Sequence, residues 1–101
     1  MEADDLDRVL WLLGSATGPD RLLDMAVNIL PGVGAVCPAP RYTESLDAAL
    51  SLVPPGTTWV LTAHAGGALA HVGAPGRSQT AHAETPALAL CMAALKHRGR
   101  A

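Results

Sequence analysis

The stretch that decides the fold runs from residue 57 to residue 72 and reads TTWVLTAHAGGALAHV. Its first half is rich in threonine, tryptophan, valine and leucine, which favour extended backbone, so we predict a strand over residues 57–63. The small residues Ala65-Gly66-Gly67-Ala68 predict a turn, and residues 68–72 are expected to return as an antiparallel second strand. This hairpin is the predicted centre of the sheet.

The register of this hairpin sorts its side chains. A two-residue turn at Gly66-Gly67 places His64 opposite Leu69 and Thr62 opposite His71, and opposed residues share a face of the sheet. A slip by one residue would mix the two faces, which favours this register. The apolar face holds Trp59, Leu61, Ala63, Ala70 and Val72, and the more polar face holds Val60, Thr62, His64, Leu69 and His71.

The segment after the hairpin predicts a loop and then a helix. Residues 73–84 are rich in glycine, proline, serine and threonine, which is typical of a loop. Thr85-Pro86 then begins a helix that is expected to run to about Arg98. Residues 87–95 are apolar on every side, so we expect the sheet to cover one side and a second subunit the other. The protein is therefore predicted to be a homo-oligomer, dimer or larger, and Leu90→Asp should dissociate it if this helix forms the contact.

Upstream of the hairpin the sequence predicts a helix that begins after Asp4 or Asp5 and ends at Gly14. Trp11 and Leu12 lie outside its apolar stripe, which indicates either burial in a thick core or contact with another subunit. The stripe consists of Leu6, Val9, Leu10 and Leu13.

Two further helices and a short strand are expected before the hairpin. Thr17-Gly18-Pro19-Asp20 predicts the start of a helix that ends at Pro31-Gly32, and Thr43 is expected to cap a helix over residues 44–53. The apolar run 33–37, bounded by prolines, is interpreted as a strand. The inward faces of the two helices are predicted to be Leu22, Ala26, Ile29 and Leu30, and Leu46, Ala49, Leu50 and Val53.

Length, charge and cysteine spacing exclude several classes of protein. The 101 residues allow one domain, 1–101, and seven Lys and Arg against nine Asp and Glu argue against a general nucleic-acid binder. No apolar run reaches the roughly 20 residues of a membrane span, and no signal peptide is expected. Cys37 and Cys91 match no metal or redox spacing, so both are expected to be free thiols in the cytoplasm.

Three blocks of sequence, in this order, carry a resemblance to a known family. They are Thr17-Gly18-Pro19-Asp20-Arg21 with Leu23-Asp24, then Pro40-Arg41-Tyr42-Thr43 with residues 45–50 and 52–54, then residues 85–91 with 93–95. Together they span roughly residues 6 to 98 and resemble the phage ABA sandwich domain family, small proteins of tailed phages and prophages. The resemblance implies an α/β (α+β) fold, a three-layer α/β/α sandwich whose small sheet contains the antiparallel hairpin. It also implies the host cytoplasm as location and no particular activity.

The sequence contains no recognisable catalytic motif. Its serines lie in no nucleophile elbow, and nothing near Cys37 in the sequence would activate that thiol. Residues 73–78 lack the Gly-Lys-Ser/Thr ending of a phosphate-binding loop, and the three histidines of residues 64–82 follow no known metal-ligand spacing. We therefore predict a protein that is not an enzyme and holds neither cofactor nor metal.

A binding site for a small anionic ligand of the nucleotide type is the leading functional hypothesis. Arg77 would hold a phosphate or carboxylate, hydroxyls would add donors, and histidines would stack on a base. The function expected is a phage accessory protein that sequesters a nucleotide immune signal of the host, an anti-defence role inferred by analogy. The alternative is a structural or protein-interaction module that assembles through the apolar C-terminal helix. The predicted ligand-binding residues are Arg77, Ser78, Thr80, His64, His71, His82 and Arg98.

Overall fold

The computed structural model describes residues 2–30, 33, 36–74 and 76–99 and confirms a mixed α+β fold built around an antiparallel sheet. The strands are hydrogen-bonded in the order β1-β2-β3, so each is antiparallel to its neighbour in the chain. No helix of the described residues is long and apolar enough to cross a membrane. The elements are α1 (Glu2–Ser15), α2 (Arg21–Asn28), α3 (Leu46–Leu50), β1 (Thr58–His64), β2 (Gly67–Ala74), β3 (Arg77–Ala83) and α4 (Pro86–Gly99).

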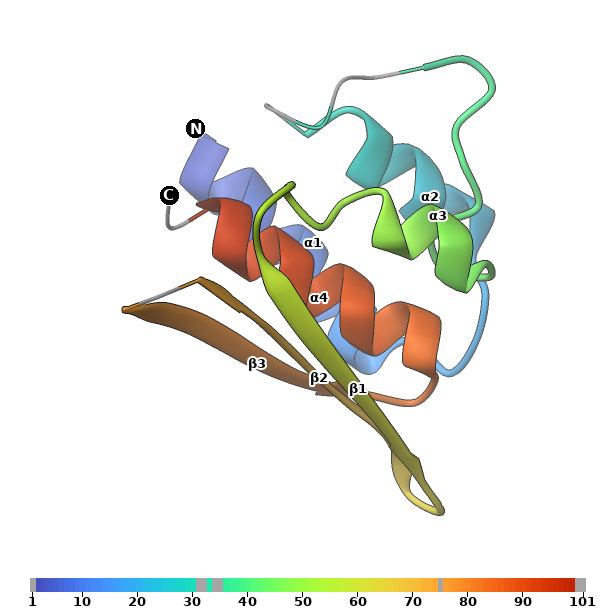
Figure 1. Ribbon diagram of the computed structural model, residues 1–101. Helices are drawn as coiled ribbons and strands as arrows, with labels where there is room; N and C mark the ends of the chain where they lie inside the picture. Colours follow the sequence, from blue (N-terminus) through green and yellow to red (C-terminus); the bar gives the residue numbers. More distant parts are fainter. Residues whose placement is uncertain (1, 31–32, 34–35, 75, 100–101) are drawn as a thin grey trace.

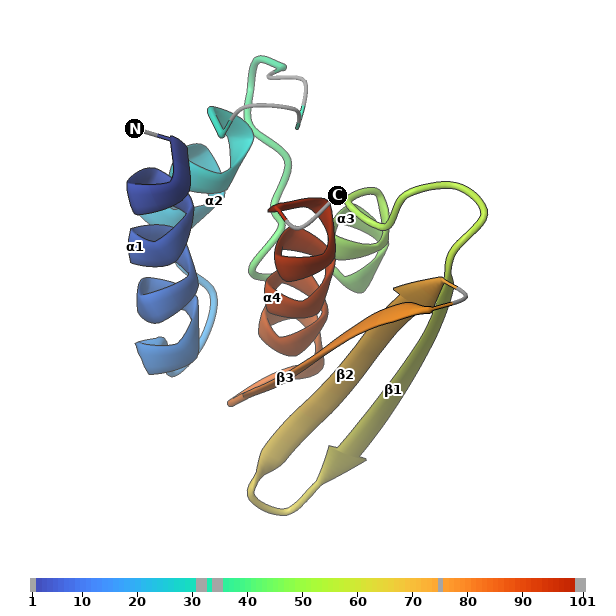
Figure 2. The same ribbon diagram turned by 90° about the vertical axis from the view of Figure 1, so that its left-hand side faces the viewer.

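The helices all lie on one side of the sheet, which differs from the expected sandwich with helices on both sides. Helix α4 packs against β2 and β3, α1 and α3 pack against α4, and α2 packs against α1 (Figures 1 and 2). Within the described part of the chain, no helix covers the other face of the sheet. That face carries mostly hydroxyl and imidazole groups, which remain hydrated without an apolar cover.

Helix α4 is the centre of the core. Leu88, Leu90 and Cys91 are completely buried, and the alanines of the helix let the sheet and the neighbouring helices approach closely. Its lack of a polar face is therefore explained within one chain, by the sheet on one side and by α1 and α3 on the other. Leu90 does not form a subunit contact on this helix, because its side chain is completely buried.

Residues 77–83 form strand β3, where the sequence predicted a loop. Gln79, Ala81 and Ala83 point toward α4, while the alternating residues Ser78, Thr80 and His82 point away from it and are exposed. This alternation was hidden by the turn residues that precede it. Gly76 in that turn has a φ of 80°, a conformation that favours glycine.

The hairpin of β1 and β2 keeps the predicted faces with a different register. His64 pairs with Gly67 and Thr62 with Leu69, so the turn is Ala65-Gly66. The shift is two residues, an even number, and each side chain therefore stays on its predicted face. Position 67 requires glycine, because its φ is 134° and a Cβ there would clash with the carbonyl oxygen of Ala83 on β3.

Helix α1 is confirmed, but Trp11 is 69% exposed, so it is not part of a thick core. Helix α2 begins later than predicted, with Asp20 as its N-cap. Its inward face is as predicted only in part: Leu30 is buried and Ala26 packs against the core, but Leu22 and Ile29 are each 75% exposed. The buried residues of α2 are Leu23, Asp24, Val27 and Asn28.

The remaining upstream predictions need smaller corrections. Helix α3 is shorter than residues 44–53 and is capped by Ser45, whose Oγ accepts a hydrogen bond from the Ala48 amide, while Thr43 takes another role. The predicted strand 33–37 is not formed by its described members, because Val33 lies in a turn and Val36 and Cys37 belong to no strand. Residues 34 and 35 lie outside the described residues.

Candidate functional site

The candidate site is the uncovered side of the sheet, here called the open face. Its side chains alternate with those that pack toward α4, and all of them are exposed. Five of the seven predicted ligand-binding residues lie on this face, contributed by all three strands. The open face consists of Thr58, Val60, Thr62, His64, Leu69, His71, Ser78, Thr80 and His82.

Two histidines from the outer strands meet across the middle strand. The rings of His64 and His82 stack with their centroids 5.1 Å apart and their planes inclined by 28°. The residue between them is Gly67, and a Cβ at this position would lie 3.4 Å from Cε1 of His82. The amide of Gly66 donates to Nδ1 of His64 at 3.2 Å, which places the proton of the neutral ring on Nε2. The pair thus offers an exposed aromatic surface.

The third histidine of the open face belongs to a cross-strand pair. His71 on β2 lies directly opposite Thr80 on β3, and Nδ1 of His71 lies 3.2 Å from Oγ1 of Thr80. Ser78 is the next residue of β3 on the same face. Hydroxyl and imidazole groups therefore follow one another along β3, with His71 beside them on β2, and all are open to solvent.

Arg77 lies on the other side of the sheet. It alternates with Ser78, and its guanidinium Nη2 lies 3.5 Å from Nε2 of His97 on α4. The predicted combination of Arg77 with the three histidines is therefore not assembled within one chain.

Arg98 is also separated from the open face. Its Nε donates to the backbone oxygen of Leu52 at 2.6 Å and so ties the end of α4 to the segment after α3. Lys96, also near the end of α4, donates from Nζ to the backbone oxygen of Thr80 at 3.2 Å. Lys96 and Arg98 thus fasten α4 to its neighbours.

The chemistry of the open face suits binding. The three strands contain no aspartate or glutamate, so no carboxylate repels an anion there. Its serine and threonine hydroxyls and its imidazoles are hydrogen-bond donors, and the stacked rings present a flat aromatic surface. In the part of the chain that the structure describes, no group of three or more His, Cys, Asp or Glu is placed to hold a metal ion.

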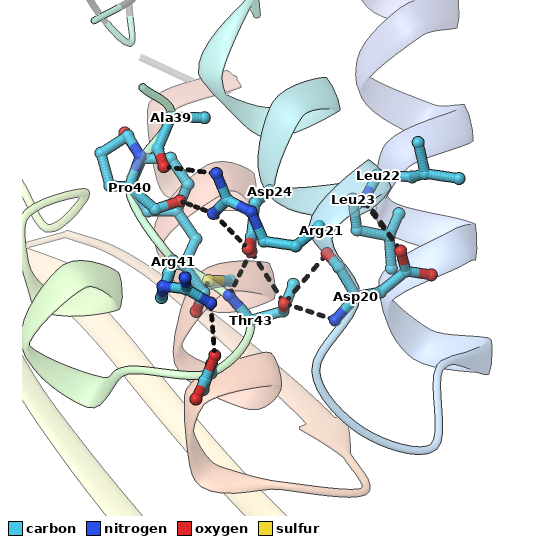
Figure 3. Close-up of polar contacts among 12 residues, drawn as sticks. Asp20, Arg21, Leu22, Leu23, Asp24, Ala39, Pro40, Arg41 and Thr43 are labelled. Atoms are coloured by element: carbon cyan, nitrogen blue, oxygen red, sulfur yellow. Dashed lines mark hydrogen bonds and ion pairs between the residues drawn. The ribbon is translucent and has the colours of Figure 1, made fainter. Parts of the chain in front are cut away.

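A buried polar cluster on α2 was not foreseen from the sequence. Asp24, 1% exposed, accepts hydrogen bonds from the amide and hydroxyl of Thr43, each at 2.7 Å, and pairs with Nη1 of Arg21 at 2.9 Å (Figure 3). Arg21 also donates to the carbonyl oxygen of Ala39 at 3.0 Å. Every polar partner of this carboxylate belongs to the chain itself, so the cluster fixes the segment before α3 against α2. Only the position of an acid among apolar residues of a helix signalled it.

The buried thiol lies beside this cluster. Sγ of Cys91 donates to the backbone oxygen of Tyr42 at 3.1 Å. Burial raises the pKa of Cys91 to about 12, and it also raises the pKa of the Tyr42 hydroxyl. Cys91 is therefore a core residue and no nucleophile, while Cys37 is exposed.

Comparisons of this chain with protein-family models, with curated proteins and with solved structures found no match.

Proposed function

We propose that this protein is a non-catalytic binding protein and that its open face captures a small anionic ligand of the nucleotide type. The observation that carries the proposal is the gathering of His64, His71, Ser78, Thr80 and His82 on one uncovered face of the sheet. Three strands contribute to it, so the fold itself holds these side chains together. A rigid set of donors loses little entropy when a ligand binds.

The ligand class follows from the donors. Hydroxyls and imidazole N–H groups suit phosphate or carboxylate oxygens, and the stacked pair of His64 and His82 suits a planar base. The bases of this face are imidazoles, and the three strands contain no carboxylate that could orient and activate one of them. We propose capture without a reaction.

The biological setting of the proposal rests on the resemblance to phage ABA sandwich proteins. In that setting the protein acts in the host cytoplasm as a phage accessory protein that sequesters a nucleotide immune signal. The site proposed here differs from the one expected from the sequence, because Arg77 and Arg98 take no part in it.

The direct test is calorimetry with a panel of cyclic nucleotides and ADP-ribose derivatives. We expect one of them to bind, His82→Ala to weaken binding at least about tenfold, and Arg77→Ala, as matched control from the same strand, to leave it unchanged. Bound ligand should also be recovered intact after denaturation. Failure of the whole panel to bind, or a loss with Arg77→Ala alone, contradicts the proposal.

A second candidate function, a protein-interaction module, is favoured by the outer helices. Trp11 on α1 and Leu22, Met25 and Ile29 on α2 are each more than half exposed. Large apolar side chains on the surface often mark protein contacts. Since α4 is buried, such a module would assemble through α1 and α2. This function would be favoured if no nucleotide of the panel binds and if Trp11→Ser and Ile29→Ser abolish the binding of a protein partner.

A further inference from the structure

The two edges of the sheet are protected very differently. β1 and β3 are both edge strands, and each has backbone groups that no neighbouring strand satisfies. The edge of β3 carries two basic residues: Lys96 donates to the backbone oxygen of Thr80 at 3.2 Å, and Arg77 begins the strand. β1 reads TWVLTAH and contains neither a charged residue nor a proline. Natural proteins place lysine, proline or other charges on sheet edges to prevent pairing with another chain, and β1 has none of these.

β1 is also poorly covered on its faces. Helix α4 lies mainly over β2 and β3, so the outer strand extends beyond the helical layer (Figure 2). Trp59, on the side of the helices, remains 42% exposed, and Val60, on the open face, is 59% exposed. Consecutive apolar residues that are exposed on both faces of an edge strand are typical of a strand that becomes an inner strand of a larger sheet when another strand pairs with it.

We propose that β1 pairs with β1 of a second copy of this chain, antiparallel, and so joins the two sheets into one across a two-fold axis. The occupant is a second copy because the strand fits itself. Identical uncharged strands face each other without like-charge repulsion, and an axis perpendicular to the sheet keeps each copy's helices on the same side.

The register of this pairing follows from the length of β1. All seven residues pair only when the axis passes beside Leu61, the middle residue. Val60 then lies opposite Thr62 of the second copy, and Trp59 lies opposite its Ala63. The bulky indole therefore meets a small residue, and the aliphatic Val60 meets another β-branched residue, both favourable in strands. The open faces of the two copies become continuous, but the pairing does not depend on any ligand.

The test is the mass of the full chain by light scattering, between about 1 and 100 μM, a range that covers typical weak and moderate affinities. We expect a dimer of twice the 10.3 kDa chain mass. In the double variant Val60→Lys with Thr62→Lys, each lysine lies opposite a lysine of the other copy, and the dissociation constant should rise at least about tenfold. Val60→Lys with Thr62→Glu places opposite charges together and should restore the dimer.

The matched control puts the same lysines on the other edge strand. Ser78→Lys with Thr80→Lys also changes exposed residues of the open face and should leave the dimer intact. Circular dichroism confirms that each variant keeps its fold. The proposal is overturned by a wild-type monomer over this range, or by Val60→Lys with Thr62→Lys remaining dimeric. It is also overturned if Val60→Lys with Thr62→Glu stays monomeric, because that result excludes the proposed register. Dissociation of the control Ser78→Lys with Thr80→Lys overturns it as well.

Discussion

Helix α4 and the open face of the sheet lie on opposite sides of strand β2, and the burial of leucine side chains differs between them. Leu90 on α4 is completely buried, whereas Leu69 on β2 is 40% exposed on the open face. Both are leucines that directly follow an alanine in the sequence, so the hydrophobicity of the residue itself does not separate them. What separates them is the cover that the rest of the chain supplies, which is complete around α4 and missing over the open face.

The largest effect should come from an acid introduced at each leucine. Leu90→Asp buries a carboxylate without a partner and should cost at least about 4 kcal/mol of unfolding free energy, enough to unfold many small domains. Leu69→Asp keeps its carboxylate in water and should cost about 1 kcal/mol or less. Urea denaturation followed by circular dichroism measures both. If Leu90→Asp stays folded and only converts an oligomer into monomers, α4 would instead be a subunit contact.

A smaller effect is expected from adding volume on the two sides of β2. Ala70 faces α4 and is completely buried, so Ala70→Leu should overpack the core and cost about 1–3 kcal/mol. The neighbouring His71→Leu on the open face should change the unfolding free energy by about 0.5 kcal/mol or less. Equal losses from the two variants would show that something covers the open face in the folded protein.

The mildest probe is chemical labelling of the two thiols without any mutation. Cys37 is exposed, while burial raises the pKa of Cys91 to about 12 and thereby keeps the thiolate scarce. Near neutral pH we expect a thiol reagent to modify Cys37 in the folded protein and Cys91 only after unfolding. Mass spectrometry of peptides gives the extent at each site. Rapid modification of Cys91 in the folded protein contradicts a core packed around α4.

Much of the fold was predictable because its signals are local. The alternation in β1 and β2, the Thr85-Pro86 start of α4 and the two faces of the hairpin all follow from neighbouring residues. β3 was missed because turn residues precede it and its residues are mostly polar with only alanines facing the core, which is also typical of a loop. Part of the inward face of α2 was missed because Asp24 is buried through Thr43, and a partner 19 residues away is not visible in a local pattern.

The candidate site was predictable in part for the same reason. The histidines and hydroxyls were identified as residues, and alternation placed His64 and His71 on one face. The position of Arg77 depends on the strand character of 77–83, since alternation then turns it away from Ser78 and toward His97. The contact between His64 and His82 depends on Gly67 in a third segment, which only the assembled sheet reveals.

The central claim, that the open face binds the ligand, is tested most directly by the imidazole resonances of the protein during titration with each nucleotide of the panel. His64, His71 and His82 lie on the open face, while His97 is 3% exposed beside Arg77 and serves as an internal control. We predict that the signals of the three open-face histidines shift with saturation and that the signal of His97 stays in place. A shift of His97 alone, or no shift of the three while a ligand binds, would contradict the account.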